Sequence, residues 1–570
     1  MKPILRNGIH RIAVGGMSTA WRRLFAAVFA LAWLVLWFLG LGSRSLSEPD
    51  EGRYAEVARE MFVSGDWLTP RLDGFNFFDK PALHYWATAL FYSAFGVHEW
   101  TARLWVSLTA LLTIIVVGWA VARFHGRHIG AAAAVVLGST LLFFAGARIN
   151  TTDMSVTAFL SVAICLFMVA QFDPQAARLR VRLCLLGWAS IALAVLSKGL
   201  IGLLFPAMAL CAFMLWERRV SIMSRLSIGW GLLVFMAIAA PWFVAMSLKH
   251  PDFFDYFFVK EHFSRFLTTA DDRDHQPWFF AVVVLLGLFP WVGFLPISPG
   301  GWTSLVKTGR PVRFLLCWIV VVFVFFSVSK SKLPFYILPI FPALAILVAV
   351  HLSTLSMRSL TWRFVGVAVV AAVMAVAALT YHASTRHLSE QINLRPLLIW
   401  FARALGMLAV VSAVGVLALI WRQRNLAIML LGFATLLAWQ MVFLNMGPIA
   451  SDLSAKPVAQ LMLPVLRDDT EVFTVHAYLR GLPFYLQRLV TVVDEDPADI
   501  VPGSASRPGA FLADMGAFER RWSTARSAVG VVDPDLIAKL QADGLPFDII
   551  GKAPTGVVIA SRSLTDGAAH

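Results

Sequence analysis

The chain has 570 residues, of which 59% are hydrophobic and only 14% charged, against about 25% charged residues in an ordinary soluble domain. This composition excludes a typical soluble globular protein and indicates an integral membrane protein. The net charge of +14 does not indicate a nucleic-acid-binding protein, because the basic residues are spread over short loops and form no single patch or arm.

Apolar runs of the length needed to cross a bilayer recur along most of the chain. The first run follows a basic N-terminus but is too long for a signal peptide and lacks a small-residue cleavage site, so we expect a retained helix. The cysteines fall inside apolar runs without metal-ligand spacing and are interpreted as small hydrophobic residues, namely Cys165, Cys184, Cys211 and Cys317. Hydropathy predicts thirteen helices, at residues 24–42, 98–121, 129–147, 153–171, 183–197, 199–216, 227–247, 277–297, 312–328, 334–352, 362–381, 396–421 and 425–445.

The charges between these helices predict an orientation. One side is expected to be cytoplasmic, because short cytoplasmic loops carry an excess of Lys and Arg. The opposite side is expected to face outward and carries the acidic loops 43–97 and 248–276, together with the C-terminal segment. Lys and Arg are concentrated in the N-terminal segment and in the connections near residues 123–127, 178–182, 218–225, 307–313, 358–363 and 422–424.

The composition changes at about residue 446, where prolines, charges and short β-type runs begin. We therefore predict a membrane domain over residues 1–445 and a small α/β domain over residues 446–570. No glycine loop of the Walker or Rossmann type occurs, which argues against a nucleotide-driven pump. In the second domain, strands are predicted at 471–475, 488–493 and 556–560, and helical segments at 509–527 and 534–543.

The polar stretch at residues 48–54 lies between two apolar runs and therefore at a membrane face. Asp50 and Glu51 follow a proline, which is typical of acids that cap the start of a helix. Arg53 and Tyr54 come next, and a helical apolar face suited to the membrane interface follows, made of Ala55, Ala58, Met61 and Phe62. Such a helix holds Asp50 at a fixed depth in the membrane interface. Asp50 is therefore either a helix cap or a catalytic residue.

Two further outer segments each allow two interpretations. Asp79 and Lys80 form either a turn with a local ion pair or a site where the Lys80 ammonium binds a phosphate. In the segment 148–153, helix capping explains the asparagine and the threonines, but Asp153 enters the outer end of a predicted span. An ionised residue within a span usually faces a cavity.

The loop 248–276 and the connection after residue 328 add basic groups on the same side. Glu261 and Arg265 are four residues apart, so they either pair along a helix or leave Arg265 to bind a phosphate bidentately. The groups of the second segment are either interfacial anchors or anion-binding groups, namely Lys330, Lys332 and Tyr336.

Four residues on the outer side are candidate metal ligands. Their spacing matches no ligand signature. The sequence therefore requires no cofactor, and a divalent metal stays an open alternative. The four candidate ligands are His84, His98, Glu99 and His262.

Five short motifs carry a resemblance to known proteins. They are Glu-Pro-Asp-Glu-Gly-Arg-Tyr at 48–54, Asp-Lys-Pro at 79–81, Ser-Lys-Gly at 197–199, Glu-His-Phe-Ser-Arg-Phe at 261–266 and Lys-Leu-Pro-Phe-Tyr at 332–336. The chain resembles the aminoarabinose transferases of lipid A modification, within the protein mannosyltransferase-like group of GT-C glycosyltransferases. The resemblance covers nearly the whole chain and implies an α-helical polytopic membrane protein of GT-C type with about 13 transmembrane helices and a small periplasmic α/β C-terminal domain.

The resemblance implies an inverting enzyme that moves 4-amino-4-deoxy-L-arabinose from undecaprenyl phosphate to a phosphate of lipid A, which gives resistance to polymyxin and cationic peptides. It implies a bacterial inner-membrane location, a periplasmic site, membrane lipids as neighbours and no nucleic-acid partner. Asp50 and Asp153 are the implied catalytic acids, and Lys80 and Arg265 the ligands of the donor phosphate. We expect further substrate-binding residues at Glu51, Arg53, Tyr54, Tyr85, Lys198, Lys330, Lys332 and Tyr336.

Two other functions fit the sequence. A related enzyme of the same fold would pass another sugar to a protein, a glycan or another lipid. A transporter or flippase would also have many spans, but it would carry charges near helix middles and paired half-repeats, whereas here the charges gather at the outer face. The favoured reading requires Asp50, Lys80, Asp153 and Arg265 to converge on one outward-facing pocket.

Overall fold

The structure is a computed structural model that describes residues 19–264, 275–384, 395–495 and 500–565. The chain divides into two compact units, Met1–Gly40 and Leu41–His570. The described residues of the first unit form helix α2 (Thr19–Phe38), where a helix is predicted at 24–42. The second unit contains all other described helices and strands, so the predicted boundary at 445/446 falls inside one unit and stays a prediction.

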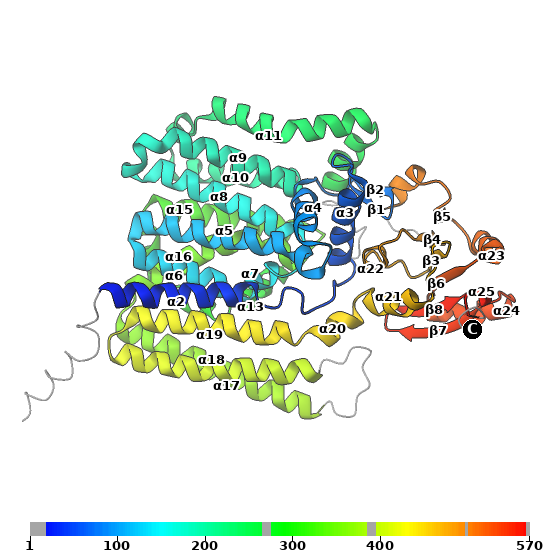
Figure 1. The fold of residues 1–570 in the computed structure, drawn as a ribbon. Helices are drawn as coiled ribbons and strands as arrows, with labels where there is room; N and C mark the ends of the chain where they lie inside the picture. Colours follow the sequence, from blue (N-terminus) through cyan, green and yellow to red (C-terminus); the bar gives the residue numbers. More distant parts are fainter. Residues whose placement is uncertain (1–18, 265–274, 385–394, 496–499, 566–570) are drawn as a thin grey trace, which may run out of the picture. The chain divides into compact units, whose positions relative to one another are not determined.

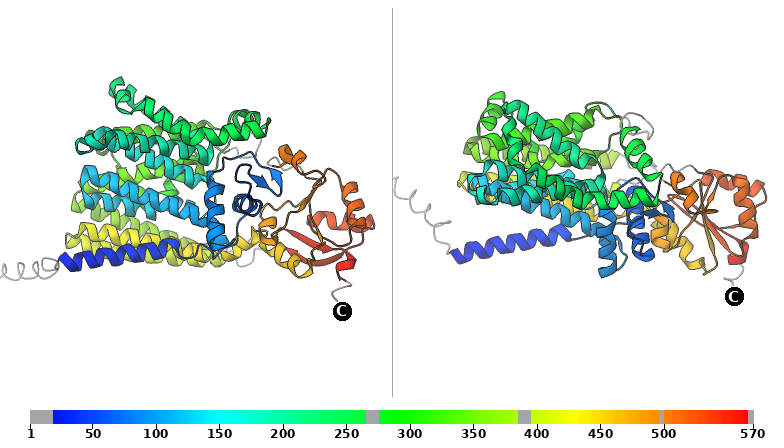
Figure 2. Two further views of the ribbon diagram at one scale, coloured as in Figure 1. Left: turned by 45° about the horizontal axis from the view of Figure 1, so that its top comes forward. Right: turned by 90° about the horizontal axis from the view of Figure 1, so that it is seen from above.

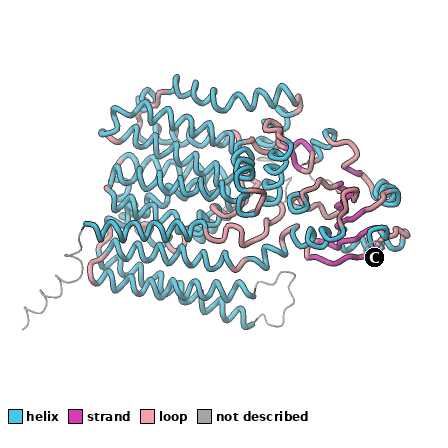
Figure 3. Tube along the Cα trace, in the orientation of Figure 1, coloured by secondary structure: helices cyan, strands magenta, loops and turns pink. Residues whose placement is uncertain are grey.

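Long apolar helices of the second unit lie side by side (Figures 1 and 3). These segments are helical because a backbone surrounded by apolar groups must satisfy its N–H and C=O groups within the helix. The helices are α5 (Glu99–His125), α6 (Arg127–Ser139), α7 (Leu141–Gly146), α8 (Thr152–Phe172), α9 (Arg180–Lys198), α10 (Ile201–Glu217), α11 (Ile228–Lys249), α13 (Phe279–Gly287), α14 (Pro299–Lys307), α15 (Arg310–Val328), α16 (Phe341–Thr354), α17 (Met357–Ser384), α18 (Arg395–Ile420) and α19 (Arg424–Leu444).

The prediction of a polytopic α-helical membrane protein is confirmed. Each of the thirteen predicted segments contains a described helix, and nine helices of the described residues are long and apolar enough to cross a membrane. Two further apolar helices, Ala27–Phe38 and Ile201–Glu217, are shorter.

Two of the predicted spans are interrupted. The segment 129–147 is divided into α6 and α7 at Thr140, whose backbone is extended and follows Gly138 and Ser139, residues that are poor helix formers. The segment 277–297 is helical only to Gly287, because Pro290 supplies no backbone N–H to continue the ladder, and a short 3-10 helix, η4 (Trp291–Phe294), follows.

The loop predicted at 43–97 contains structure of its own. Helix α3 (Asp50–Ser64) ends at Gly65, which adopts φ +69° as a helix stop commonly requires. A hairpin of β1 (Arg71–Leu72) and β2 (Phe75–Asn76) and helix α4 (Leu83–Phe95) follow. Every residue of α3 from Glu51 to Met61 is buried, so α3 is not the half-exposed interfacial helix that its apolar face predicts.

The C-terminal residues build a mixed sheet in the order β5-β4-β3-β6-β8-β7 (magenta in Figure 3). The first four strands of this order are parallel, and β8 pairs antiparallel with both β6 and β7. The strands are β3 (Glu471–Val475), β4 (Thr491–Val493), β5 (Phe511–Leu512), β6 (Ala528–Val532), β7 (Asp548–Ala553) and β8 (Gly556–Ala560). The accompanying helices are α20 (Gly447–Asp452), α21 (Lys456–Met462), α22 (Leu482–Leu486), α23 (Met515–Thr524), α24 (Ile537–Ala542) and α25 (Arg562–Thr565).

The predicted α/β character of this region is confirmed, although the sheet is larger than predicted. The strands predicted at 471–475 and 556–560 are present as β3 and β8, and only the end of 488–493 forms a strand, β4. The predicted helix at 509–527 is shorter, because β5 occupies its start.

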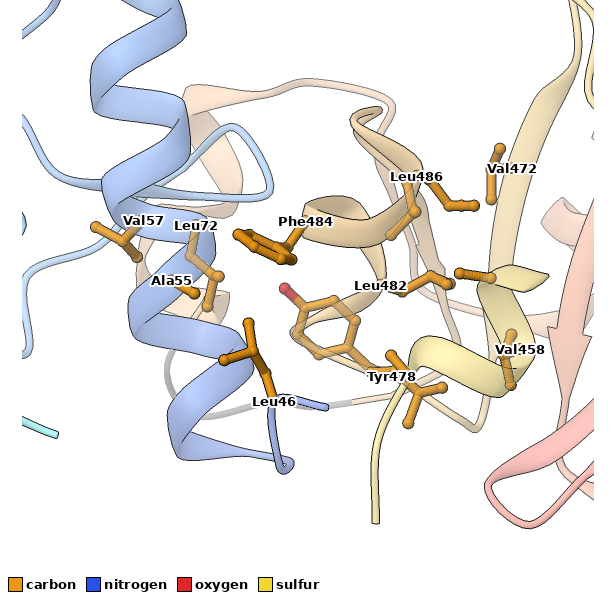
Figure 4. Packing of buried hydrophobic residues seen from close by; sticks show 14 of the residues in the cluster. Leu46, Ala55, Val57, Leu72, Val458, Val472, Tyr478, Leu482, Phe484 and Leu486 are labelled. Atoms are coloured by element: carbon orange, nitrogen blue, oxygen red, sulfur yellow. The ribbon is translucent and has the colours of Figure 1, made fainter. Parts of the chain in front are cut away.

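Helix α3 shares a hydrophobic core with the C-terminal residues of the same unit. Figure 4 shows Ala55 and Val57 of α3 near Phe484 of α22, with Val472 of β3 on the far side of the cluster. Two further views show α3 and α4 between the long helices and the sheet (Figure 2). Burial of apolar area against the C-terminal residues therefore holds α3 in place.

Candidate active site

The start of α3 carries two acids with different surroundings. The Asp50 side chain is 36% exposed and pairs with the Arg53 guanidinium one turn later. Arg53 in turn lies 5.1 Å from the Tyr54 ring centroid. Asp50 is therefore a solvent-accessible carboxylate beside a cation. A residue that contacts substrate must be accessible in this way.

Glu51, predicted to bind substrate, is buried and engaged within the protein. Its oxygens accept hydrogen bonds from Arg103 Nε (2.7 Å) and Nη2 (2.9 Å) and from the Asn150 backbone N–H (3.0 Å). The Arg44 guanidinium also lies 3.7 Å from it. Although burial alone would raise the pKa of Glu51, the charges of Arg103 and Arg44 lower it to about 2. This geometry favours a positioning role for Glu51.

Tyr54 lies where the polar segments meet. Its ring is 5.9 Å from His84 and 6.1 Å from Tyr85, centroid to centroid. Burial raises the pKa of Tyr54, and the charge of Arg53 opposes this rise. Three carboxylates from separate segments of the chain also raise the pKa of Tyr54. They are Asp50, Asp79 and Asp153. The structure thus brings these three acids within electrostatic range of one hydroxyl.

The Asp79-Lys80 turn is tied to the π-helix η3 (Asp255–Ser264), which follows α11. Tyr256 donates its hydroxyl hydrogen to Asp79 Oδ1 (2.7 Å), and Lys80 Nζ donates to the carbonyl of Asp79 (2.9 Å). Lys80 is only partly buried. Its ammonium is therefore held beside Asp79 at a point that solvent or a ligand can reach.

Asp153 and Lys198 form an ion pair between the start of α8 and the end of α9. The two side chains are 14% and 13% exposed. Lys198 Nζ also lies 4.4 Å from the ring centroid of Tyr336, in the 3-10 helix η5 (Pro334–Ile340). Three segments predicted to contribute to the site therefore meet here.

The remaining predicted residues have varied environments. Lys332 is 4% exposed, whereas Lys330 is exposed. Arg265 and the side chain of His262 lie outside the described residues, so the convergence of Arg265 with Asp50, Lys80 and Asp153 stays a prediction.

Three of the metal-ligand candidates have other contacts. His84 Nε2 lies 3.0 Å from Asn150 Oδ1, and burial lowers the pKa of His84 to about 4. His98 caps α5, and Glu99 pairs with Lys456 at 2.7 Å. Among the described residues, no three His, Cys, Asp or Glu side chains are arranged to hold a metal ion.

Arg103 and Arg44 are the site residues that the sequence reasoning missed. Arg103 is fully buried and, besides Glu51, donates to the carbonyls of Leu41, Arg44 and Ser45. The sequence feature that could have identified Arg103 is its position inside the predicted span 98–121, because an ionised residue in a span usually has a specific partner.

Two known families match parts of the chain. The family described as Aminoarabinose transferase C-terminal domain matches residues 458–561. The family described as Dolichyl-phosphate-mannose-protein mannosyltransferase matches residues 79–244. The first match contains all six strands of the C-terminal sheet, and the second contains Lys80, Asp153 and Lys198.

Curated relatives carry the name undecaprenyl phosphate-alpha-4-amino-4-deoxy-L-arabinose arabinosyl transferase. The protein of Erwinia tasmaniensis is 34% identical over 334 residues, which cover 57% of this chain and 59% of the relative. Transferase 1 of Proteus mirabilis is 34% identical over 337 residues, covering 58% of this chain and 60% of the relative. The chain thus spans about three fifths of the length of these relatives.

Solved structures extend the likeness over nearly the whole chain. The archaeal oligosaccharyltransferase AglB from Archaeoglobus fulgidus, at 13% identity and a TM-score of 0.52 over 90% of this chain and 70% of its own, shares the fold. The crystal structure of ArnT from Cupriavidus metallidurans bound to undecaprenyl phosphate is 31% identical, with a TM-score of 0.89 over 95% of this chain and 98% of that chain. This agreement in fold and sequence shows that the chain belongs to the aminoarabinose transferase family of GT-C glycosyltransferases.

Proposed function

We propose that the protein is an inverting glycosyltransferase that moves 4-amino-4-deoxy-L-arabinose from undecaprenyl phosphate to a phosphate of lipid A. The observation that carries this proposal is the match to an ArnT whose crystal structure is described as bound to undecaprenyl phosphate. The names of the curated relatives support the same donor and sugar.

The chemistry of the transfer fits the groups that meet around Tyr54. When the anomeric bond breaks, negative charge grows on the lipid phosphate, and fixed cations stabilise that charge. We assign this role to Lys80 and Arg265, with Lys332 in support. Because the acceptor phosphate is already ionised near neutral pH, it attacks the anomeric carbon directly from the opposite face and requires no strong base.

The two proposed catalytic acids have different roles in this scheme. Asp50 is the more exposed, and we propose that its carboxylate contacts the aminosugar and stabilises positive charge on the ring or the amino group. Asp153 is paired with Lys198, and we propose that this ion pair fixes the position of its carboxylate in the site. We further propose a bacterial inner-membrane location, a cytoplasmic N-terminus and a periplasmic site, as the basic loops predict.

A second candidate is a transferase of the same fold with another sugar or acceptor. The match of residues 79–244 to a family described as a protein mannosyltransferase favours it. In that case the acceptor is a hydroxyl group, which must lose a proton, and Asp50 acts as the general base.

Mass spectrometry of lipid A from cells with and without the protein distinguishes the two. We expect an aminopentose on a lipid A phosphate only when the active protein is present. Asp50→Asn should reduce the transfer by about a hundredfold or more while the protein still inserts and folds, because the neutral amide removes the charge in the site. Asp66→Asn is the matched control, since Asp66 pairs with surface groups after α3. Unmodified lipid A in cells with the wild-type protein contradicts the proposed acceptor. Full transfer by Asp50→Asn contradicts the proposed catalytic role of Asp50.

A further inference from the structure

A cavity of about 270 Å³ lies among the helices far from the candidate active site. Asp153 marks the site at the start of α8, and α8 continues for 21 residues, or about 30 Å at 1.5 Å per residue. The cavity follows the later part of α8 and is lined by α9, α10, the start of α11, α15 and the 3-10 helix η2 (Val220–Arg225). The cavity therefore lies near the ends of the helices that are opposite to the candidate active site.

The walls of this cavity are apolar. Phe167, Leu210 and Phe314 line it from three different helices. Two N–H groups of the walls already have partners, because Gln171 Nε2 donates to the Arg225 carbonyl (3.0 Å) and Trp188 Nε1 to the Leu226 carbonyl (3.1 Å). A cavity with almost entirely apolar walls offers too few polar partners for ordered water, so a hydrocarbon chain is its natural occupant.

Large apolar side chains continue from the cavity to the outside of the bundle. Leu215, Trp216 and Val220, at the end of α10 and the start of η2, are 79%, 48% and 71% exposed. In a membrane protein such residues face lipid. A lipid chain can thus enter the cavity from the bilayer without crossing a polar barrier.

Exposed arginines lie in the chain segments next to the residues that line this part of the cavity, and we call them the Arg rim: Arg178, Arg182, Arg218, Arg219 and Arg225. The neighbouring acids serve other cations, since Asp173 pairs with Arg123 and Glu217 with Arg313. Within the described part of the chain, no carboxylate pairs with the Arg rim. An apolar pocket beside unpaired arginines has the charge and shape of an acidic lipid site.

We propose that the cavity and the Arg rim bind an acidic glycerophospholipid of the bilayer, with one acyl chain in the cavity and the phosphate on the rim. Guanidinium groups suit this headgroup because they bind phosphate bidentately. The site is separate from the sugar-transfer site and does not depend on the proposed function. It gives the bundle a fixed lipid at the ends of α8 and α10.

Native mass spectrometry of the full-length protein tests this proposal. Protein in detergent is mixed with equal amounts of phosphatidylglycerol and phosphatidylcholine of the same chain length, and retained lipids are counted. We expect phosphatidylglycerol to be preferred about tenfold or more. The variant Arg218→Gln/Arg219→Gln/Arg225→Gln should lose the preference, whereas Lys307→Gln/Arg358→Gln/Arg422→Gln, which removes three other cations from connections between helices, should keep it.

The apolar half of the proposal has its own variant. Ala207→Trp fills the cavity from α10 and leaves the Arg rim intact, so retention of phosphatidylglycerol should fall although the charges are unchanged. Heat unfolding checks that each variant is folded. Equal retention of the two lipids by the wild type overturns the proposal, as does unchanged retention by a folded Arg-rim variant or by folded Ala207→Trp.

Discussion

The ion pair between Asp153 and Lys198 joins two helices at the candidate site, so its partners can be tested one at a time. Lys198→Met removes the cation and leaves the Asp153 carboxylate uncompensated in a poorly solvated place. We expect kcat/KM for sugar transfer to fall at least about tenfold, which corresponds to about 1.4 kcal/mol. A transfer assay with purified donor lipid measures this.

A surface ion pair provides the control for this change. Lys249 pairs with Asp66 at 3.1 Å but is 42% exposed, so Lys249→Met should change kcat/KM less than about twofold. Lys198→Arg keeps the charge and should recover most of the activity. Equal activity of Lys198→Met and the wild type would remove Lys198 from the site.

The short sequence motifs predicted which charged residues lie at the candidate site, but they did not predict what each residue does there. Asp50 and Lys198 stand in short motifs, and the structure places them in contact with other predicted groups. Glu51 stands in the same motif, but its oxygens are used by Arg103, which is 52 residues away. A motif identifies residue types, whereas the partner of a buried acid depends on packing between distant segments.

At the scale of elements, two glycines let α3 approach the C-terminal residues. A Cβ on Gly52 would lie 2.7 Å from the Cα of Gly481 and 2.7 Å from Glu48 Oε1. The Glu48 carboxylate accepts hydrogen bonds from the backbone N–H groups of Arg480 (3.0 Å) and Gly481 (2.7 Å). Glycine at position 52 is thus required by a backbone contact beside Asp50.

Gly52→Ala tests this contact. We expect it to destabilise the protein by about 1–3 kcal/mol, because the backbone of Gly481 must move. A lower midpoint of heat unfolding and faster proteolysis of the C-terminal residues are the readouts. Gly406→Ala is the matched control: Gly406 lies in helix α18 with open space around it, so alanine should be neutral or stabilising. Equal stability of Gly52→Ala and the wild type would contradict the argument.

The elements themselves were largely predictable, because hydrophobic periodicity and length identify membrane helices directly. The burial of α3 was not predictable, since the residues that cover it come from more than 400 positions later, as Glu48 and Gly481 illustrate. Strand β6 was missed because its short apolar run, Ala528–Val532, follows a helix without a turn signal.

At the scale of the whole molecule, buried acids lie where α3 and the β1-β2 hairpin meet the C-terminal residues. Asp73 Oδ1 accepts the Val490 backbone N–H at 2.7 Å and lies 3.3 Å from Arg507. Burial raises the pKa of Asp73 well above its usual range despite these partners. Burial also raises the pKa of Glu60, with the nearby Glu56 and Asp73 adding to the effect, and raises that of Glu48 to about 7.

These shifts predict how stability depends on pH. The native state holds protons on Glu48, Glu60 and Asp73 that the unfolded chain releases near pH 4. Their contribution to the free energy of unfolding is therefore complete below about pH 4 and is lost as the pH rises through the raised pKa of each group, which is about 7 for Glu48. Glu51 acts in the opposite sense, but its pKa of about 2 confines its effect to pH values below about 4.

We accordingly expect the midpoint of heat unfolding in detergent to be lower at pH 8.5 than at pH 5.5. Glu60→Gln should reduce this difference, because the amide keeps the shape of the protonated acid and cannot ionise. Asp66→Asn is the control: hydrogen bonds from the Thr69 N–H and from Lys249 outweigh burial and lower the pKa of Asp66, so this carboxylate is already charged at both pH values. The argument fails if the midpoint does not fall between the two pH values, or if Glu60→Gln and Asp66→Asn keep the same difference as the wild type, since the buried carboxyls would then hold no extra proton in the native state.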